Sequence, residues 1–342
     1  MIAPIPDAPV LDTPVLDAAV LVADIGGTNA RFALATITPG AVTPDAVKIG
    51  PMHAFRAEDY ESIRDAADAF LEAVQAAPRQ ACFAVAGPIT DAVVEFTNSP
   101  WVLDIEKTKR QLRLDQLLAI NDFEALATSV RQLGSADFVE VKAGASDPAL
   151  PTLVIGPGTG IGQALIVPAE RGDRIIPTEG GHVAFAPYND EEIEVLRFIA
   201  REHKRVSVER LLSGRGLVNI HRALCAISGT PRVSLQADEI TRAAQTLEFP
   251  VAVKAVDMFC AIFGSVAGDA ALSSGARGGV VIGGGIIPKI QPVFFKSAFV
   301  ERFLDKGRMR DYVAGIPIRL ITRDGAALVG AAAKLKATID AP

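Results

Sequence analysis

The chain has 342 residues, of which 49% are hydrophobic and 22% charged, and its formal net charge is −6. This length predicts about two domains with buried cores, and the lack of a basic patch argues against a nucleic-acid partner. The three separated cysteines form no Cys-x-x-Cys motif, which argues against a disulfide framework or structural zinc. No apolar run reaches the roughly 18 residues of a membrane span, and no secretory signal opens the chain. We therefore expect a cytoplasmic protein without a membrane partner.

The first nineteen residues are rich in proline and contain Pro-Val-Leu-Asp twice, at 9–12 and 14–17. Prolines at this density interrupt both helices and sheet ladders. We predict that residues 1–19 form a disordered extension without a role in catalysis. A partner-binding tail is the alternative.

A first glycine-rich turn joins apolar runs at 20–25 and 31–37, which predicts a β-hairpin. Glycine lets such a turn expose several backbone N–H groups in one concavity, and this arrangement binds phosphate. Asp24 ends the first run, where a carboxylate suits Mg²⁺, directly or through water; a turn-forming aspartate is the alternative. The predicted nucleotide-binding residues here are Ala23, Asp24, Ile25, Gly26, Gly27 and Thr28.

The chain between 59 and 121 alternates between helical and strand patterns. Apolar residues at helical spacing predict a helix over 59–76, and strands are expected near 81–86, 92–96 and 117–121. The motif Phe96-Thr-Asn-Ser-Pro-Trp101 is interpreted as structural, in the wall of a cleft.

Asp122 follows an apolar strand and opens a helix, so its carboxylate is expected at the carboxyl edge of a sheet. Asn121 and Glu124 have the spacing of a capping box, and helix capping is therefore an alternative role for them. Capping does not account for Asp122.

A second glycine-rich turn joins apolar runs at 152–157 and 161–167. Two such turns favour a nucleotide held from two sides over a pair of structural hairpins. A P-loop is excluded because no Gly-Lys-Ser/Thr occurs. A dinucleotide fingerprint fails because Ile161 stands at the third glycine position and the turn leads into a strand.

The remaining chain predicts further α/β structure. The expected helices lie near 190–203, 214–227, 236–247, 251–273 and 324–338, and the expected strands near 279–283 and 317–321. Asp190-Glu-Glu192 is interpreted as a set of first-turn acids that stabilise a helix N-terminus.

The two turns, with a later buried strand and glycine turn at 279–288, resemble the sugar kinase, actin and heat-shock ATPase superfamily. The motifs at 119–125, 179–182 and 209–217 are similar to those of bacterial glucokinases of the non-repressor type. The resemblance covers roughly residues 20 to 338.

This resemblance implies a two-domain α/β architecture, the actin-like ATPase (ribonuclease-H-like) fold, with the active cleft between the domains. The small α/β domain would comprise residues 20–132 and be completed by a C-terminal helix at 323–340. The large α+β domain would comprise residues 133–322. The resemblance also implies a homodimer.

The resemblance further implies transfer of the γ-phosphate of ATP, with Mg²⁺, to the 6-hydroxyl of glucose. Asp122 would accept the hydroxyl proton in a reaction that otherwise needs mainly positioning. Carboxylates, an imidazole and an amide can together bind the hydroxyls of a hexose, although a structural histidine is the alternative for His182. The implied sugar-binding residues are Asn121, Asp122, Glu179, His182 and Glu209. The further nucleotide-binding residues are Gly158, Thr159, Gly160, Gly283, Gly284 and Gly285.

Other functions fit less well. A repressor-type sugar kinase would carry cysteines after its Glu-x-Gly-His motif, and none lies between His182 and Glu209. A related transcription regulator would need an N-terminal helix-turn-helix, which the proline-rich start cannot form. The alternatives that stay open are a non-catalytic actin-like or chaperone-like ATPase and a kinase of different hexose specificity.

Overall fold

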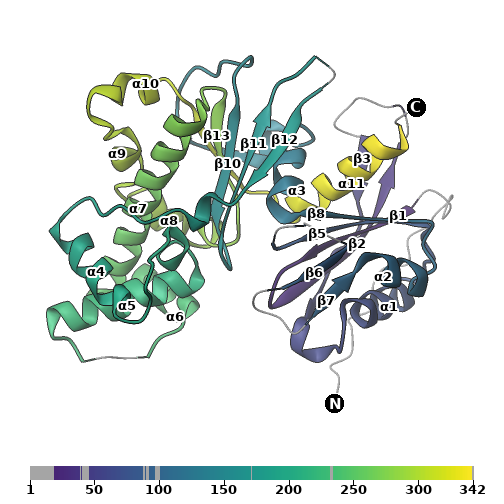
Figure 1. Cartoon of the computed structure of the whole chain (residues 1–342), viewed down its shortest axis with the longest axis horizontal. Helices are drawn as coiled ribbons and strands as arrows, with labels where there is room; N and C mark the ends of the chain where they lie inside the picture. Colours follow the sequence, from purple (N-terminus) through teal and green to yellow (C-terminus); the bar gives the residue numbers. More distant parts are fainter. Residues whose placement is uncertain are drawn as a thin grey trace.

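The computed structural model describes residues 19–340 except 39, 41–45, 88, 90–91, 97–100, 171 and 232–233. Residues 1–18 of the predicted extension and Asn98 lie outside the described residues, whereas Ala19, placed in the extension by the prediction, begins the first strand. Two six-stranded sheets, each with helices packed against it, form the framework of the described chain (Figure 1).

The first sheet has the strand order β3-β2-β1-β5-β8, and β4 also pairs with β2. Its strands are β1 (Ala19–Ile25), β2 (Asn29–Ile37), β3 (Val47–Ile49), β4 (His53–Arg56), β5 (Gln80–Val85) and β8 (Gln116–Asn121). β1 and β2 form the predicted first hairpin, whereas β1, β5 and β8 run parallel. Parallel strands bring their carboxyl ends to one edge of the sheet, and this edge carries the candidate site.

The second sheet has the order β12-β11-β10-β13-β14-β9. Its strands are β9 (Phe138–Lys142), β10 (Thr152–Pro157), β11 (Ile161–Val167), β12 (Arg174–Thr178), β13 (Gly279–Ile282) and β14 (Ile318–Ile321). β10 and β11 form the predicted second hairpin, and β10, β13 and β14 are parallel. A separate pair consists of β6 (Val93–Glu95) and β7 (Val102–Asp104).

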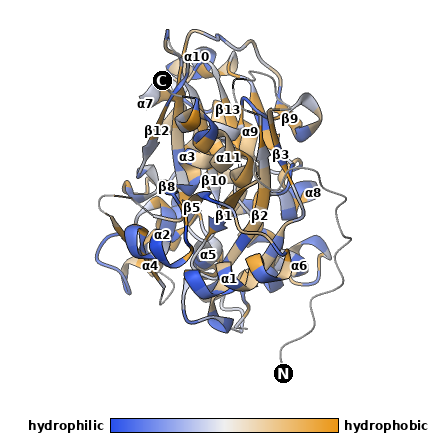
Figure 2. Ribbon diagram, turned by 90° about the vertical axis from the view of Figure 1, so that its right-hand side faces the viewer, coloured by the Kyte–Doolittle hydropathy of each residue, from blue (hydrophilic) through white to orange (hydrophobic). Residues whose placement is uncertain are grey.

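Helices fall into three groups. Those that belong with the first sheet are α1 (Ile63–Ala73) and α2 (Ile105–Gln111), and those between the sheets are α3 (Asp122–Ser129) and α11 (Ala326–Ile339). The others belong with the second sheet: α4 (Asp190–Ala200), α5 (Gly214–Ser228), α6 (Ala237–Gln245), α7 (Pro250–Ser274), α8 (Gln291–Phe294), α9 (Phe299–Leu304) and α10 (Arg310–Ala314). Helices α1, α2 and α6 contain both hydrophilic and hydrophobic residues, whereas α11 is largely hydrophobic (Figure 2).

The C-terminal helix α11 returns to the first sheet. Its apolar residues share a core with β1, β2 and β5, and it also packs along α3. The chain thus passes between the sheets twice, after α3 and before α11. The domain boundary at 132 and 133 stays a prediction.

The helix predicted over 59–76 is too long at both ends. Residues 57–59 form a 3-10 turn, and the α-helix begins only after Ser62, whose Oγ accepts a hydrogen bond from the Asp65 N–H at 3.2 Å. A serine at this position caps a helix because it satisfies an N–H that has no intrahelical partner. The helix ends at Ala73, just before Gln75 adopts a φ of 51°.

The 25-residue helix α7 is long and apolar enough to cross a membrane by length and composition. In its most apolar window, however, 61% of the residues are buried inside the protein. It packs against α5, α6 and α9 in the largest hydrophobic core. Its apolar character is therefore accounted for by this core.

Candidate active site

Asp24 and Asp122 lie at the same edge of the first sheet. Asp24 aligns with Ala84 of β5, and Ala84 aligns with Ile120 of β8, two residues before Asp122. Both carboxylates therefore stand where parallel strands end, as the strand pattern predicted for Asp122. Both side chains are half-buried.

The environment of Asp122 raises its pKa to about 7, chiefly because burial disfavours the charged carboxylate. The nearby carboxylate of Asp24 also raises it, and Glu179 contributes in the same direction. Hydrogen bonding opposes this shift, since the Phe123 N–H donates to Asp122 Oδ1 at 2.9 Å. The structure thus brings residues from both sheets into electrostatic contact, and it gives Asp122 the pKa of a base at neutral pH.

Burial likewise raises the pKa of Asp24, while Arg31 lowers it. Arg31 stands directly opposite Asp24 in the β1–β2 hairpin, and its guanidinium forms an ion pair with Asp324 at 3.0 Å. Asp24 raises the pKa of Asp122, and Asp324 raises that of Asp24, so carboxylates gather here and a divalent cation would relieve their repulsion. No group of three or more metal-ligating side chains exists among the described residues. A Mg²⁺ ion here would therefore keep most of its waters or use nucleotide oxygens, as this ion commonly does.

Asn121 caps helix α3. Its Oδ1 accepts from the N–H groups of Phe123 at 2.9 Å and Glu124 at 3.1 Å, and its Nδ2 donates to the Gly87 carbonyl at 3.1 Å. The capping alternative is thus observed for Asn121, which retains one amide hydrogen for a ligand. Glu124 does not complete a capping box, because its carboxylate pairs with Lys334 at 2.8 Å.

The second and third glycine motifs meet at the end of the second sheet. The Gly283 N–H donates to the Ile155 carbonyl at 3.0 Å, and the Ile286 N–H donates to Pro157 at 3.3 Å. The first residue of α5, Gly214, donates its N–H to the Gly158 carbonyl at 3.0 Å. Two glycine turns and a helix N-terminus therefore lie together, an arrangement of the kind that binds anions in other proteins. Among the described residues the first turn makes no hydrogen bond to the second.

Glu179 precedes a 3-10 turn at 180–182, and His182 is the last residue of this turn. Their side chains are more than half exposed, and His182 Nε2 lies 3.7 Å from Glu179 Oε2. Glu209 comes from a separate 3-10 turn and is half-buried. Its Oε2 accepts a hydrogen bond from the Ile161 N–H at 3.2 Å. Glu209 therefore contacts the second hairpin directly.

Helix α3 packs closely against the second sheet because β11 has a glycine, Gly162, at the point of contact. The ring of Phe123 packs against Gly162 where any Cβ atom would overlap it. Phe123 belongs to a core with residues of β10, β11 and β13. This contact places Asp122, one residue earlier, beside the second sheet.

Trp101 is 2% exposed in the core of the first sheet, and its indole N–H donates to the Tyr60 carbonyl at 3.0 Å. These contacts give it the structural role that the motif suggested.

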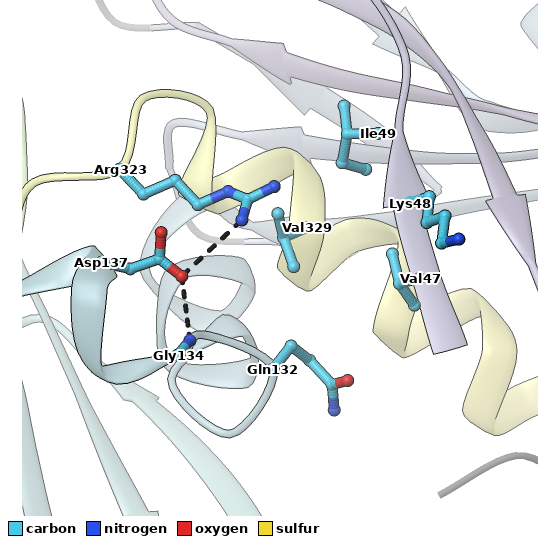
Figure 3. A pocket seen from close by; sticks show the side chains of 8 residues that line it. All are labelled: Val47, Lys48, Ile49, Gln132, Gly134, Asp137, Arg323 and Val329. Carbon is cyan, nitrogen blue, oxygen red and sulfur yellow. Dashed lines mark hydrogen bonds and ion pairs between the residues drawn. The ribbon is translucent and has the colours of Figure 1, made fainter. Parts of the chain in front are cut away.

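A cavity of about 500 Å³ lies beside the segments after α3 and before α11, where the chain passes between the two sheets (Figure 3). It is lined by Val47, Lys48, Ile49, Gln132, Gly134, Asp137, Arg323 and Val329. None of the predicted substrate or nucleotide residues lines it, and the Arg323 guanidinium there already lies 3.6 Å from Asp137. We do not assign a substrate to this cavity.

The sequence alone overlooked two neighbours of the predicted residues, Arg31 and Gln163. Pairing the residues outward from the first glycine turn would have placed Arg31 opposite Asp24, because the turn fixes the register of a hairpin. Gln163 lies against Gly180, and no sequence signal indicates this contact because 17 positions separate them.

Comparisons with known proteins agree with this geometry. The glucokinase family model matches residues 21–338. A curated glucokinase of Chromobacterium violaceum is 42% identical over 313 residues, which cover 91% of this chain and 88% of that protein. The solved glucokinase of an Antarctic psychrotroph is 40% identical, with a TM-score of 0.78 and coverage of 93% and 98%. A ROK family glucokinase from Streptomyces griseus, solved with glucose and AMPPNP, shares the fold at 19% identity, with a TM-score of 0.59 and coverage of 92% and 98%. The chain belongs to the glucokinase family, and its architecture is that of the actin-like sugar kinases.

Proposed function

We propose that this protein is a glucokinase that transfers the γ-phosphate of ATP to the 6-hydroxyl of glucose. The observation that supports this most directly is the position of Asp122, a half-buried base with a pKa of about 7 at the carboxyl edge of the first sheet. Two glycine turns and the N-terminus of α5, which hydrogen bonds hold together, supply the kind of backbone groups that bind a phosphate donor.

In this mechanism Asp122 takes the proton of the sugar hydroxyl as the new P–O bond forms. Asn121, Glu179, His182 and Glu209 bind the other hydroxyls and hold the acceptor oxygen in line. The phosphates lie on residues 23–28 and 158–160, and the adenosine lies near 283–285. Mg²⁺ held near Asp24 would neutralise charge on the phosphates. We further propose a cytoplasmic homodimer.

The proposal is tested by a coupled assay of ADP release with a panel of hexoses. ADP release should depend on glucose and yield glucose 6-phosphate. Release of ADP at the same rate without any sugar would instead support an actin-like or chaperone-like ATPase. A preference for another hexose would retain the kinase and correct the substrate.

Replacing Glu179 with glutamine should raise the KM for glucose about tenfold, because a neutral amide accepts hydrogen bonds less strongly than a carboxylate. The KM for ATP should change less than about twofold. Steady-state kinetics with each substrate varied in turn measures both values. Glu140→Gln, an exposed change in β9, is the control and should alter neither. A raised KM for ATP with an unchanged KM for glucose would place Glu179 at the nucleotide.

The pKa of Asp122 predicts the pH dependence of the reaction. Only the carboxylate form can accept a proton, so kcat/KM for glucose should rise about tenfold per pH unit below pH 7 and level off above it. Initial rates between pH 5 and 9, with the coupling enzymes in excess at each pH, test this. A profile that is flat from pH 5 to 8 would contradict the assignment of Asp122 as the base.

A further inference from the structure

The predicted phosphate turn and the predicted sugar site share one short stretch of strand. The turn at 158–160 leads directly into β11, whose first residue is Ile161. The Ile161 N–H donates to Glu209 Oε2 at 3.2 Å. The end of the phosphate turn is therefore bonded to a residue that we place on the sugar.

The same stretch also supports the other sugar residues. The 3-10 turn at 180–182 packs on β11, with Gly180 against Gln163 and Gly181 against Ile161. On the opposite face of the strand, Gly162 contacts Phe123, the neighbour of Asp122. A displacement of residues 161–163 would thus reach every predicted carboxylate of the sugar site.

Glu209 has the free capacity that a link between two ligands requires. One carboxylate oxygen accepts from Ile161, whereas the other makes no hydrogen bond among the described residues. An ionised carboxylate can accept about four hydrogen bonds. Glu209 can therefore hold the turn and a sugar hydroxyl at the same time.

We propose that the Glu209–Ile161 hydrogen bond couples the nucleotide and sugar sites, so that each ligand raises the affinity for the other. A nucleotide phosphate bound at the turn fixes the Ile161 N–H, which in turn fixes the Glu209 carboxylate for the sugar. Thermodynamic linkage then requires the sugar to raise nucleotide affinity by the same factor. This inference rests on the proposed function.

Gly160→Ala breaks this link without removing any functional group. Gly160 has no positive φ, so alanine fits its backbone, but the new Cβ would overlap Glu209 Oε2. Because this atom ends a flexible side chain, Glu209 can swing away and the protein should still fold. Gly158→Ala is the matched control in the same turn, since its Cβ would meet nothing closer than the Gly285 nitrogen at 3.9 Å.

The experiment is calorimetric titration of glucose, with and without saturating AMP-PNP and Mg²⁺. For the wild-type protein we expect the nucleotide analogue to lower the Kd for glucose at least about fivefold. The coupling factor is the Kd for glucose without the analogue divided by the Kd with it. In Gly160→Ala the Kd for glucose without nucleotide should rise, and the coupling factor should fall toward one. Gly158→Ala should keep the wild-type Kd for glucose, and any loss should be confined to the nucleotide.

Glu209→Gln separates the link from the charge. Glutamine still accepts from the Ile161 N–H, so glucose should bind more weakly while the coupling factor is retained. Coupling in Gly160→Ala equal to that of wild type, or a wild-type factor of one, would overturn this inference and leave the kinase assignment intact. If Gly160→Ala no longer binds the analogue, the test is its Kd for glucose without nucleotide. A value equal to that of the wild-type protein would overturn the inference. A wild-type protein that binds no glucose would overturn the proposed function itself.

Discussion

Replacing Asp122 with asparagine is expected to lower kcat by about 10²- to 10⁴-fold, because the amide cannot accept the hydroxyl proton. Asparagine preserves the size of the side chain and can still accept from the Phe123 N–H. Glucose should therefore still bind, with a Kd within a few-fold of wild type. Rapid-quench or coupled kinetics together with calorimetry measures the two quantities separately.

The same substitution should stabilise the folded protein at pH 8. The folded-state pKa of Asp122 is about 7, above its ordinary value of 3.8, so the folded protein holds this proton more tightly than the unfolded chain. Stability contributed by this group is present at low pH and is lost as the pH rises toward 7. Asparagine removes that loss, so its Tm should exceed the wild-type value at pH 8, and the two should converge near pH 4.

Asp190→Asn is the control for both measurements. Asp190 is also the first residue of a helix, α4, but it is exposed. Its substitution should change kcat less than twofold. Activity of Asp122→Asn within a few-fold of wild type would exclude Asp122 as the base.

Arg302→Met is expected to cost about 3–5 kcal/mol of unfolding free energy, because it leaves a buried carboxylate without its partner. Arg302 in α9 and Glu192 in α4 are 8% and 2% exposed and form an ion pair at 2.7 Å. The guanidinium also donates to Ser265 Oγ at 2.9 Å and lies 3.9 Å from the Tyr188 ring centroid. The loss is measured by urea denaturation.

Two further variants test the cause of this loss. Combining Glu192→Gln with Arg302→Met should restore part of the stability, because the glutamine amide is neutral. Its oxygen can still accept the hydrogen bond that the Tyr188 N–H donates to Glu192 Oε2 at 2.9 Å in the wild-type protein. Arg79→Met removes the exposed pair with Asp115 and should cost no more than about 1 kcal/mol. Equal losses for Arg302 and Arg79 would show that burial is not the reason.

Local pattern was sufficient for the two hairpins and for most helices. Alternating or continuous apolar runs around glycine turns predicted β1–β2 and β10–β11, and the register confirms both pairs. Helices α5 and α7 begin and end within one residue of their predicted limits. The short strands β3, β4, β7, β9 and β12 and the short helices α2, α8, α9 and α10 were not predicted. Their three to seven residues contain too few periods to distinguish a pattern from chance.

By itself the sequence determined the kind of groups in the site and their order: two glycine turns, an aspartate after a strand, and later acids and a histidine. These follow from neighbours within a few positions, where periodicity and turn chemistry act. Only the tertiary structure decided which groups meet. Glu209 bonds to Ile161 across 48 positions, and Phe123 packs on Gly162 across 39. Such contacts depend on how two sheets and a bridging helix pack, and packing is a property of assembled surfaces rather than of any local run of residues.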